Sequence, residues 1–322
     1  MDARLLIEKL AGACTDGNLI LAKELTKKYN LTTDDVRLKN NSAFKGACRN
    51  GHLKTAQWLT KTFGLTNEDA RSENNWALRY ACENGHTHIA EWLTKTFELT
   101  TEDVRSEGNE ALRWACLNDH LKTARWLTET FGLTIEDARS ENNWALKCAC
   151  CGGQLKTVEW LTETFGLTSE DARSENNSVL KYACANGHLE TAQWITKTFG
   201  LTTDDARFEN NWALRYACLN GQLKTAQWLT KTFELTTEDA RTKNNYALRY
   251  ACENGHLETA RWLIKTFGLT SEDARSKNNH ALRWACCYEH LETVQWLLDT
   301  FFTTKDVTEI TQDDNISQKI KR

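Results

Sequence analysis

A 34-residue repeat runs through this chain of 322 residues and limits its fold more than any other feature. The clearest copy, residues 244–277, reads NNYALRYACENGHLETARWLIKTFGLTSEDARSK. Eight copies follow one another without insertion and begin at Asn40, Asn74, Gly108, Asn142, Asn176, Asn210, Asn244 and Asn278. A fixed period of this length is typical of repeat arrays, in which each unit packs only against its neighbours. The period therefore predicts a single continuous solenoid.

Hydrophobic spacing predicts two helices in each copy. In residues 246–252, Leu248 and Cys252 lie on one helical face, and residues 257–267 carry a second apolar stripe at helical spacing. Asn245 precedes the first helix and suits its N-cap position. Gly255 ends that helix, because glycine readily adopts the left-handed conformation of a helix C-terminus.

The third segment of the repeat, residues 269–275, predicts a short helical turn. Thr270 opens it and Asp273 follows three residues later, which is the spacing of a capping box with Asp in place of the usual Glu. Gly108 replaces the first Asn of one copy, so we expect a positive φ angle at that position.

The two ends of the chain depart from the pattern. Residues 1–39 hold a divergent copy in which Glu24 replaces a tryptophan, and we interpret this copy as an N-terminal capping repeat. Residues 40–302 hold the eight repeats in one continuous solenoid. Residues 303–322 lose the pattern and are rich in charged residues, so we expect a C-terminal cap and a polar tail there.

Composition favours a soluble intracellular protein. The net charge is −4 and the pI is about 6.1, so no general basic excess favours nucleic acid or an anionic membrane. No apolar run approaches the roughly 20 residues that a membrane helix needs, and charged residues near the N-terminus argue against a signal peptide. We expect a cytoplasmic, reducing location and a monomer.

Cysteine placement argues against a disulfide scaffold. Repeats that stack helix on helix separate equivalent residues by about 8–10 Å, whereas a disulfide needs Cα atoms about 4.4–6.8 Å apart. Nine of the twelve cysteines recur one repeat apart: Cys14, Cys48, Cys82, Cys116, Cys150, Cys184, Cys218, Cys252 and Cys286. We predict that all twelve are free thiols.

The motifs Ala-Leu-Arg-x-Ala-Cys, Asn-Gly-His-Leu and Thr-Ala-x-Trp-Leu closely resemble the ankyrin repeat over residues 40–301. Ala247 stands where that family has Pro, Arg249 stands where it has His, and the chain contains no proline. The resemblance implies an all-α, ankyrin-like helical solenoid with two antiparallel helices per repeat. We expect the short helical turn to replace the family's β-hairpin. The tetratricopeptide repeat shares the 34-residue period but has longer helices, so it fits less well.

No pattern of residues predicts catalysis or metal binding. A catalytic site needs unlike groups that converge once, whereas these residues repeat. One histidine per repeat cannot surround a metal ion, so we interpret this column as bracing the loop between helices: His52, His86, His120, His188, His256 and His290. Cys148 and Cys151 would share a helical face but have no matching second pair of ligands. We expect no catalytic residues, no metal and no cofactor.

Three recurring columns have both a structural and a functional interpretation. The tryptophans from Trp58 to Trp296 lie beside the leucine stripe, and we expect them in the core between repeats. One basic column runs from Lys45 to Arg283 and another from Arg71 to Arg275. Cation rows can bind phosphate or acidic peptides, but the Glu-Asp pair of each repeat favours pairing inside the protein.

Two columns vary between repeats, which indicates that the fold does not fix them. One is the residue after the Asn-Asn pair that opens each repeat, such as Tyr246, and the other is the residue after the recurring cysteine, such as Glu253. The ankyrin resemblance implies that both border a concave partner-binding groove. Exposed aromatic side chains there suit an interface, although drift on a tolerant surface would give the same variation. The predicted partner-binding residues are Trp76, Glu83, Glu110, Leu117, Trp144, Trp212, Leu219, Tyr246, Glu253 and His280.

These observations favour a scaffold that binds a partner protein or peptide in its groove. The alternative function is a nucleic-acid or polyanion binder that uses the basic columns. Salt dependence would separate the two, because phosphate contacts weaken steeply as salt rises.

Overall fold

The computed structural model describes residues 3–302, so the expected C-terminal cap and tail lie outside the described residues. Within this part the chain forms two compact units. Unit 1 comprises residues 3–149 and 156–167, and unit 2 comprises residues 150–155 and 168–302. The expectation of one uninterrupted solenoid remains a prediction.

Helices and no strands occur in residues 3–302, which confirms the all-α class. The first helices of the repeats are α1 (Ala3–Thr15), α3 (Thr33–Arg49), α5 (Asn67–Glu83), α8 (Ser106–Leu117), α11 (Ser140–Cys151), α13 (Ser169–Ala185), α15 (Thr203–Leu219), α17 (Thr237–Glu253) and α20 (Ser276–Cys287). The second helices are α2 (Leu19–Tyr29), α4 (Leu53–Phe63), α6 (Thr87–Phe97), α9 (Leu121–Phe131), α12 (Leu155–Phe165), α14 (Leu189–Phe199), α16 (Leu223–Thr232), α18 (Leu257–Phe267) and α21 (Leu291–Phe301). The short turns are separate helices in α7 (Thr101–Val104), α10 (Ile135–Ala138) and α19 (Ser271–Ala274), and elsewhere they open the longer first helices.

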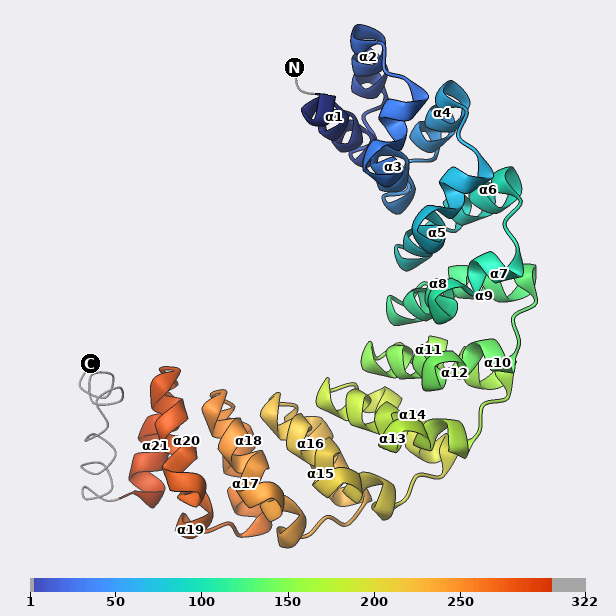
Figure 1. Cartoon of the computed structure of the whole chain (residues 1–322). Helices are drawn as coiled ribbons and strands as arrows, with labels where there is room; N and C mark the ends of the chain where they lie inside the picture. Colours follow the sequence, from blue (N-terminus) through green and yellow to red (C-terminus); the bar gives the residue numbers. More distant parts are fainter. Residues whose placement is uncertain (1–2, 303–322) are drawn as a thin grey trace. The chain divides into compact units, whose positions relative to one another are not determined.

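Each unit is a two-layered stack of these helices. In unit 1, α1, α3, α5 and α8 lie side by side in one layer, and α2, α4, α6 and α9 form the other (Figure 1). In unit 2, α13, α15, α17 and α20 follow one another in the same way. Contacts therefore run between neighbouring repeats, as the period predicts.

Leucine, alanine and cysteine form the core, because they occupy the positions where the two layers meet. Leu229 of a second helix and Leu214 of a first helix have no exposed surface, and the column cysteine Cys218 is equally buried. The prediction that the tryptophan column is core is wrong in its strict form. Only Trp160 is buried, with 4% exposed, whereas the other seven members are half-buried and pack edge-on against the phenylalanine five residues later.

The predicted capping box forms at each short turn from Thr32 to Thr270. At Thr236, the backbone N–H and the hydroxyl both donate to Oδ2 of Asp239, at 2.7 and 3.0 Å. The same carboxylate accepts hydrogen bonds from the previous repeat, since Arg207 donates from Nε at 2.9 Å and Asn211 donates from Nδ2 at 3.1 Å. One Asp therefore caps its own turn and joins two repeats.

This arrangement recurs and defines what we call the turn ladder. The guanidinium group of one repeat binds the capping Asp 32 residues later with two hydrogen bonds. Six such pairs occur within the two units: Arg37–Asp69, Arg71–Asp103, Arg105–Asp137, Arg173–Asp205, Arg207–Asp239 and Arg241–Asp273. The prediction that this basic column pairs internally is confirmed.

Within each first helix from α3 to α20, three consecutive residues adopt the left-handed conformation and separate the short turn from the main part of the helix. Glu209, Asn210 and Asn211 have φ angles of 49°, 57° and 58°. The expected positive φ at Gly108 is confirmed at 62°. The expected N-cap role of the second Asn is wrong, because Asn211 is itself left-handed and its amide binds the next repeat's Asp239.

Candidate functional site

Each first helix presents one stripe of side chains that is not part of the leucine core. It has four members in each repeat. They are the residue after the Asn-Asn pair, the Arg or Lys three residues later, the residue that follows this cation, and the residue after the column cysteine. In α15 these are Trp212, Arg215, Tyr216 and Leu219. We call the set of these stripes the first-helix face. Nine of the ten predicted partner-binding residues are half-buried on this face, and Trp144 is exposed.

Aromatic rings on the first-helix face of unit 2 form a continuous series across the repeats. Trp212 stacks on Tyr216 with ring centroids 3.9 Å apart, and Tyr246 stacks on Tyr250 at 4.0 Å. Between repeats, Tyr216 lies 5.8 Å from Tyr246. We call the whole series the aromatic ladder; it consists of Tyr182, Trp212, Tyr216, Tyr246, Tyr250, His280, Trp284 and Tyr288.

Unit 1 carries a shorter ring series. Trp76 stacks on Tyr80 at 3.9 Å, and Tyr80 lies 5.8 Å from Trp114. The exposed Trp144 contacts cations instead, with the Lys147 ammonium group 4.7 Å from its ring centroid. The difference follows from the sequence, because Cys148 occupies the position four residues after Trp144 that an aromatic residue fills in other repeats.

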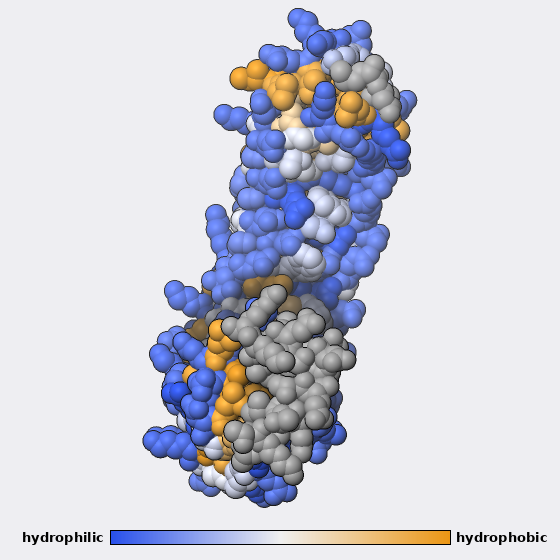
Figure 2. Space-filling model, turned by 90° about the vertical axis from the view of Figure 1, so that its left-hand side faces the viewer, coloured by the Kyte–Doolittle hydropathy of each residue, from blue (hydrophilic) through white to orange (hydrophobic). Residues whose placement is uncertain are grey.

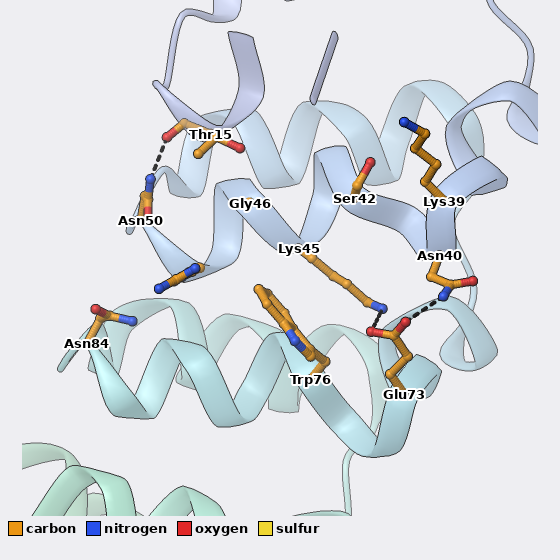
Figure 3. Close-up of a pocket in the computed structure, with 11 residues that line it drawn as sticks. Thr15, Lys39, Asn40, Ser42, Lys45, Gly46, Asn50, Glu73, Trp76 and Asn84 are labelled. Carbon is orange, nitrogen blue, oxygen red and sulfur yellow. Dashed lines mark hydrogen bonds and ion pairs between the residues drawn. The ribbon is translucent and has the colours of Figure 1, made fainter. Parts of the chain in front are cut away.

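Two lysines of the basic column, Lys45 and Lys181, form ion pairs with the next repeat. In unit 1, Lys45 reaches past the Trp76 ring to Glu73 at 2.6 Å, and the same carboxylate accepts from Asn40 (Figure 3). These residues line a cleft of about 540 Å³ beside α3 and α5. The hydrogen bond from Lys45 is the main cause of the lowered pKa of Glu73. Lys181 and Glu209 repeat this pair in unit 2 at 2.8 Å.

Arginines of the same column bind backbone carbonyls. Arg215 donates from Nε to the Asn210 carbonyl at 2.7 Å and from a terminal nitrogen to the Glu209 carbonyl at 3.0 Å. Arg79 and Arg249 make the equivalent bonds to their own left-handed segments. Burial lowers the pKa of all three guanidinium groups. Each arginine therefore braces the left-handed segment near the start of its own helix.

The acidic members of the predicted site have partners on the same face. Glu110 pairs with Arg79, and Glu253 binds His280 at 2.7 Å. Burial raises the pKa of Glu83, which lies near Arg49. Leu117 and Leu219 are half-buried, and the Leu219 carbonyl accepts a hydrogen bond from Asn254. The predicted residues thus lie on one face within each unit, and their role in binding remains a prediction.

The sequence interpretation missed the second half of each aromatic pair. The residue between the basic position and the Ala-Cys pair is aromatic in six repeats: Tyr80, Trp114, Tyr182, Tyr216, Tyr250 and Trp284. Its spacing of four residues from the variable position places both rings on one side of the helix, where they can stack. This four-residue spacing could have predicted the stacked pairs from the sequence.

The histidine column braces neighbouring repeats. His188 and Asn186 both donate to the Cys151 carbonyl, at 2.9 and 2.8 Å, and Cys151 ends the previous first helix. The histidine ring also lies against a glycine of that repeat. A Cβ atom on Gly51 would lie 2.8 Å from the His86 ring, so this close approach requires glycine. Among residues 3–302, no group of three or more His, Cys, Asp or Glu side chains could hold a metal ion.

The surface is mostly hydrophilic on the side that Figure 2 shows, with one group of apolar side chains where α1 and α2 lie and a second group in the lower part of the view. Leu5, Ile20 and Leu21 are exposed on these two helices. In the described part of the chain, no helix has the length and apolar character needed to span a bilayer.

The stacked helix pairs, the fixed 34-residue period and the braced turns define a helical repeat array. A family model described as "Ankyrin repeats (3 copies)" matches residues 10–103, 46–138 and 214–308, which together make up more than half of the chain. The protein therefore belongs to the ankyrin-repeat family. A search of curated proteins found no match. Members of this family are generally protein–protein interaction modules and are typically not catalytic.

Proposed function

We propose that this protein is a non-catalytic scaffold that binds a partner protein on its first-helix face. The observation that carries the proposal is the aromatic ladder of unit 2, which keeps half-exposed Trp, Tyr and His rings in a row across four repeats. Large rings of this kind anchor interfaces because they supply contact area with few rotatable bonds. Stacking holds them in place before a partner arrives, so binding orders few side chains.

The internal bonding of the basic columns supports a protein partner over a polyanion. The turn ladder engages one column with aspartates, and in the other column Lys45 and Lys181 bind glutamates, while Arg79 binds Glu110 and a backbone carbonyl. Phosphate binding would need these donors to face outward. Buried thiols such as Cys218, with a pKa raised by burial, fit the proposed cytoplasmic and reducing location.

Affinity capture with matched variants tests the proposal. The chain itself supplies a tolerated replacement, because Ser42 and Ser178 occupy the position of Trp212 in other repeats. Partners bound by the unaltered chain should be lost or weakened about thirtyfold by Trp212→Ser, which is the scale of an interface hot spot. Lys231→Glu on the exposed side of α16 is the control and should retain them.

Capture must be combined with a measurement of folding. Circular dichroism and chemical denaturation should show that Trp212→Ser keeps the native helix content. A partner that a folded Trp212→Ser variant retains at full affinity would contradict the assignment of the face.

A further inference from the structure

Beside the first-helix face, one position of the repeat changes the sign of its charge along the chain. This position is the first residue of each left-handed segment. This residue is Lys39 in the first segment, where it pairs with Glu8, and Glu in the next five, namely Glu73, Glu107, Glu141, Glu175 and Glu209. It is Lys again in the last two, namely Lys243 and Lys277. Where it is Glu, it can neutralise the basic residue 28 positions earlier, as Glu209 does for Lys181. Lys243 and Lys277 stand 28 positions after Arg215 and Arg249, so these arginines face a lysine position instead.

Arg215 and Arg249 consequently hold buried positive charge without a carboxylate in direct contact, although Glu209 and Glu253 lie close enough to act on them through space. Each has 7% of its surface exposed, and each donates to carbonyls of its own left-handed segment. Neither forms an ion pair within residues 3–302. Burial lowers the pKa of both guanidinium groups, as expected for charge held in a poorly solvated place. Buried charges in proteins are ordinarily paired, so this site favours an anion from outside.

Several nearby carboxylates are already engaged. Glu253 binds His280 at 2.7 Å, Glu209 binds Lys181 at 2.8 Å, and Glu238 binds Arg241 at 3.3 Å. A cleft of about 660 Å³ beside Lys277 is lined by three cations and two carboxylates, namely Arg241, Arg275, Lys277, Glu272 and Asp273. This part of unit 2 therefore keeps a local cationic excess in a chain whose net charge is negative.

Aromatic rings separate these cations. The Arg215 guanidinium lies 4.7 Å from the Tyr246 ring centroid, while Tyr250 stacks on Tyr246 at 4.0 Å. Because Tyr246 has a cation and two neighbouring rings around it, the ring face that a nucleic-acid base would need for stacking is occupied. Ring edges remain available to aliphatic or aromatic side chains of a peptide.

We propose that Arg215, Lys243, Tyr246, Arg249, Tyr250 and Lys277 bind an acidic, extended segment of the partner protein. This inference rests on the proposed scaffold function and names the chemistry of the partner. Adjacent first helices are separated by about 10 Å, and an extended chain advances about 3.4 Å per residue. A segment that crosses the helices therefore presents acidic side chains to Lys243 and Lys277 when they are about three residues apart.

Fluorescence anisotropy with the full-length chain tests this proposal. The probe is a labelled peptide of about twelve residues with Glu at every third position and Ser and Leu between. It should bind, and the affinity should fall at least about tenfold in the Lys243→Glu, Lys277→Glu double variant. A peptide with Lys in place of Glu should not bind.

The double variant is expected to fold, because Glu209 occupies the equivalent position with the same left-handed backbone, φ 49° and ψ 46°. The new glutamates would pair with Arg215 and Arg249 as Glu209 pairs with Lys181, so thermal stability should be kept or increased. Lys231→Glu on α16 makes the same charge change outside the face and should leave peptide affinity unchanged.

The outcomes separate this inference from the proposed function. Equal binding by the double variant, equal binding of the lysine peptide, or no binding of the acidic peptide would overturn the inference. Tighter binding of single-stranded RNA of the same length would assign the patch to nucleic acid and would also overturn it. A captured partner that Trp212→Ser loses but the double variant retains would preserve the scaffold function and reject the acidic segment.

Discussion

The turn ladder and the first-helix face both contain a basic column with a 34-residue period, yet the structure uses them differently. In the turn ladder, every arginine with a described partner carboxylate meets an aspartate that the backbone N–H and the hydroxyl of its own capping threonine also bind. On the first-helix face, the partner changes from a glutamate to backbone carbonyls, and the neighbouring residue changes from Glu209 to Lys243. A residue kept in every repeat serves the joint between repeats, whereas a residue whose partner changes is available for recognition.

Acid should disrupt the turn ladder in all repeats at once, which is the largest effect we expect. Burial alone would raise the pKa of Asp69, but hydrogen bonds from Arg37, Thr66 and Asn41 outweigh burial and lower it to about 2. The pKa values of Asp103, Asp137, Asp205, Asp239 and Asp273 are also lowered. The folded state thus binds protons less readily than the unfolded chain.

The sign of the pH dependence follows from these lowered pKa values. Stability is fully present above the unfolded pKa of about 4 and is lost as the pH falls towards 2, with about 2 kcal/mol from Asp69 alone. Urea denaturation between pH 6 and pH 3 should show a steep fall in the free energy of unfolding. A flat profile over this range would show that the ladder contributes little.

A single break in the turn ladder should cost less than acid does. Asp239→Ala removes a cap and leaves Asn211 and Arg207 without their acceptor, so we expect a loss of about 2–3 kcal/mol. Glu238→Ala is the matched control, because that neighbouring side chain is 82% exposed and forms one weak pair. Chemical denaturation of both variants decides the matter, and equal stability of the two would contradict the role of Asp239.

The two tryptophan positions separate packing from recognition. Trp228 is half-buried against Phe233, so Trp228→Ala should cost about 2 kcal/mol, less than a fully buried ring. Trp212→Ser loses the stack on Tyr216 and should cost about 1 kcal/mol, while it weakens partner binding. The two free energies of unfolding can be compared directly. If Trp212→Ser were the more destabilising change, the first-helix face would be core.

Thiol reactivity should report the smallest effect. Cys218 is buried in the column that every repeat keeps, and burial raises its pKa, whereas Cys151 and Cys287 are half-exposed at a position that varies. A thiol reagent at pH 8 should modify Cys151 and Cys287 first and the column cysteines only on unfolding. Denatured, unreduced protein should show all twelve thiols. Early modification of Cys218, or a smaller total, would contradict this expectation.

Periodicity was sufficient to predict the helices, because apolar spacing and turn residues recur in register. Residues 257–267 were predicted as a helix and form α18 with the same bounds. The Thr-Asp capping boxes followed from their three-residue spacing. These features depend on neighbours along the chain, so one repeat contains the information.

Features that depend on the next repeat were harder to predict. Whether Trp228 is core depends on how far the second helix turns away from its neighbour, and helical spacing alone does not give that angle. The sequence predicted a positive φ angle only at the position of Gly108. The full three-residue left-handed segment was not predicted, because it begins with residues such as Glu209 and Lys243, which rarely adopt that conformation. The stacking of Tyr216 on Trp212 could be predicted only by comparing two positions of the repeat that lie four residues apart.

The left-handed segments have a consequence for the chirality of the chain. A left-handed backbone costs an L-amino acid about 1–2 kcal/mol per residue. Each full repeat carries three left-handed residues in succession, and all of them are L-amino acids except Gly108. For a D-amino acid the same φ and ψ angles are relaxed, because the Cβ atom no longer crowds the following carbonyl oxygen. Exposed Asn210 is therefore a place where a mirror-image residue would suit the fold better than the natural one. Since the segment recurs with the period, this strain grows in proportion to the number of repeats.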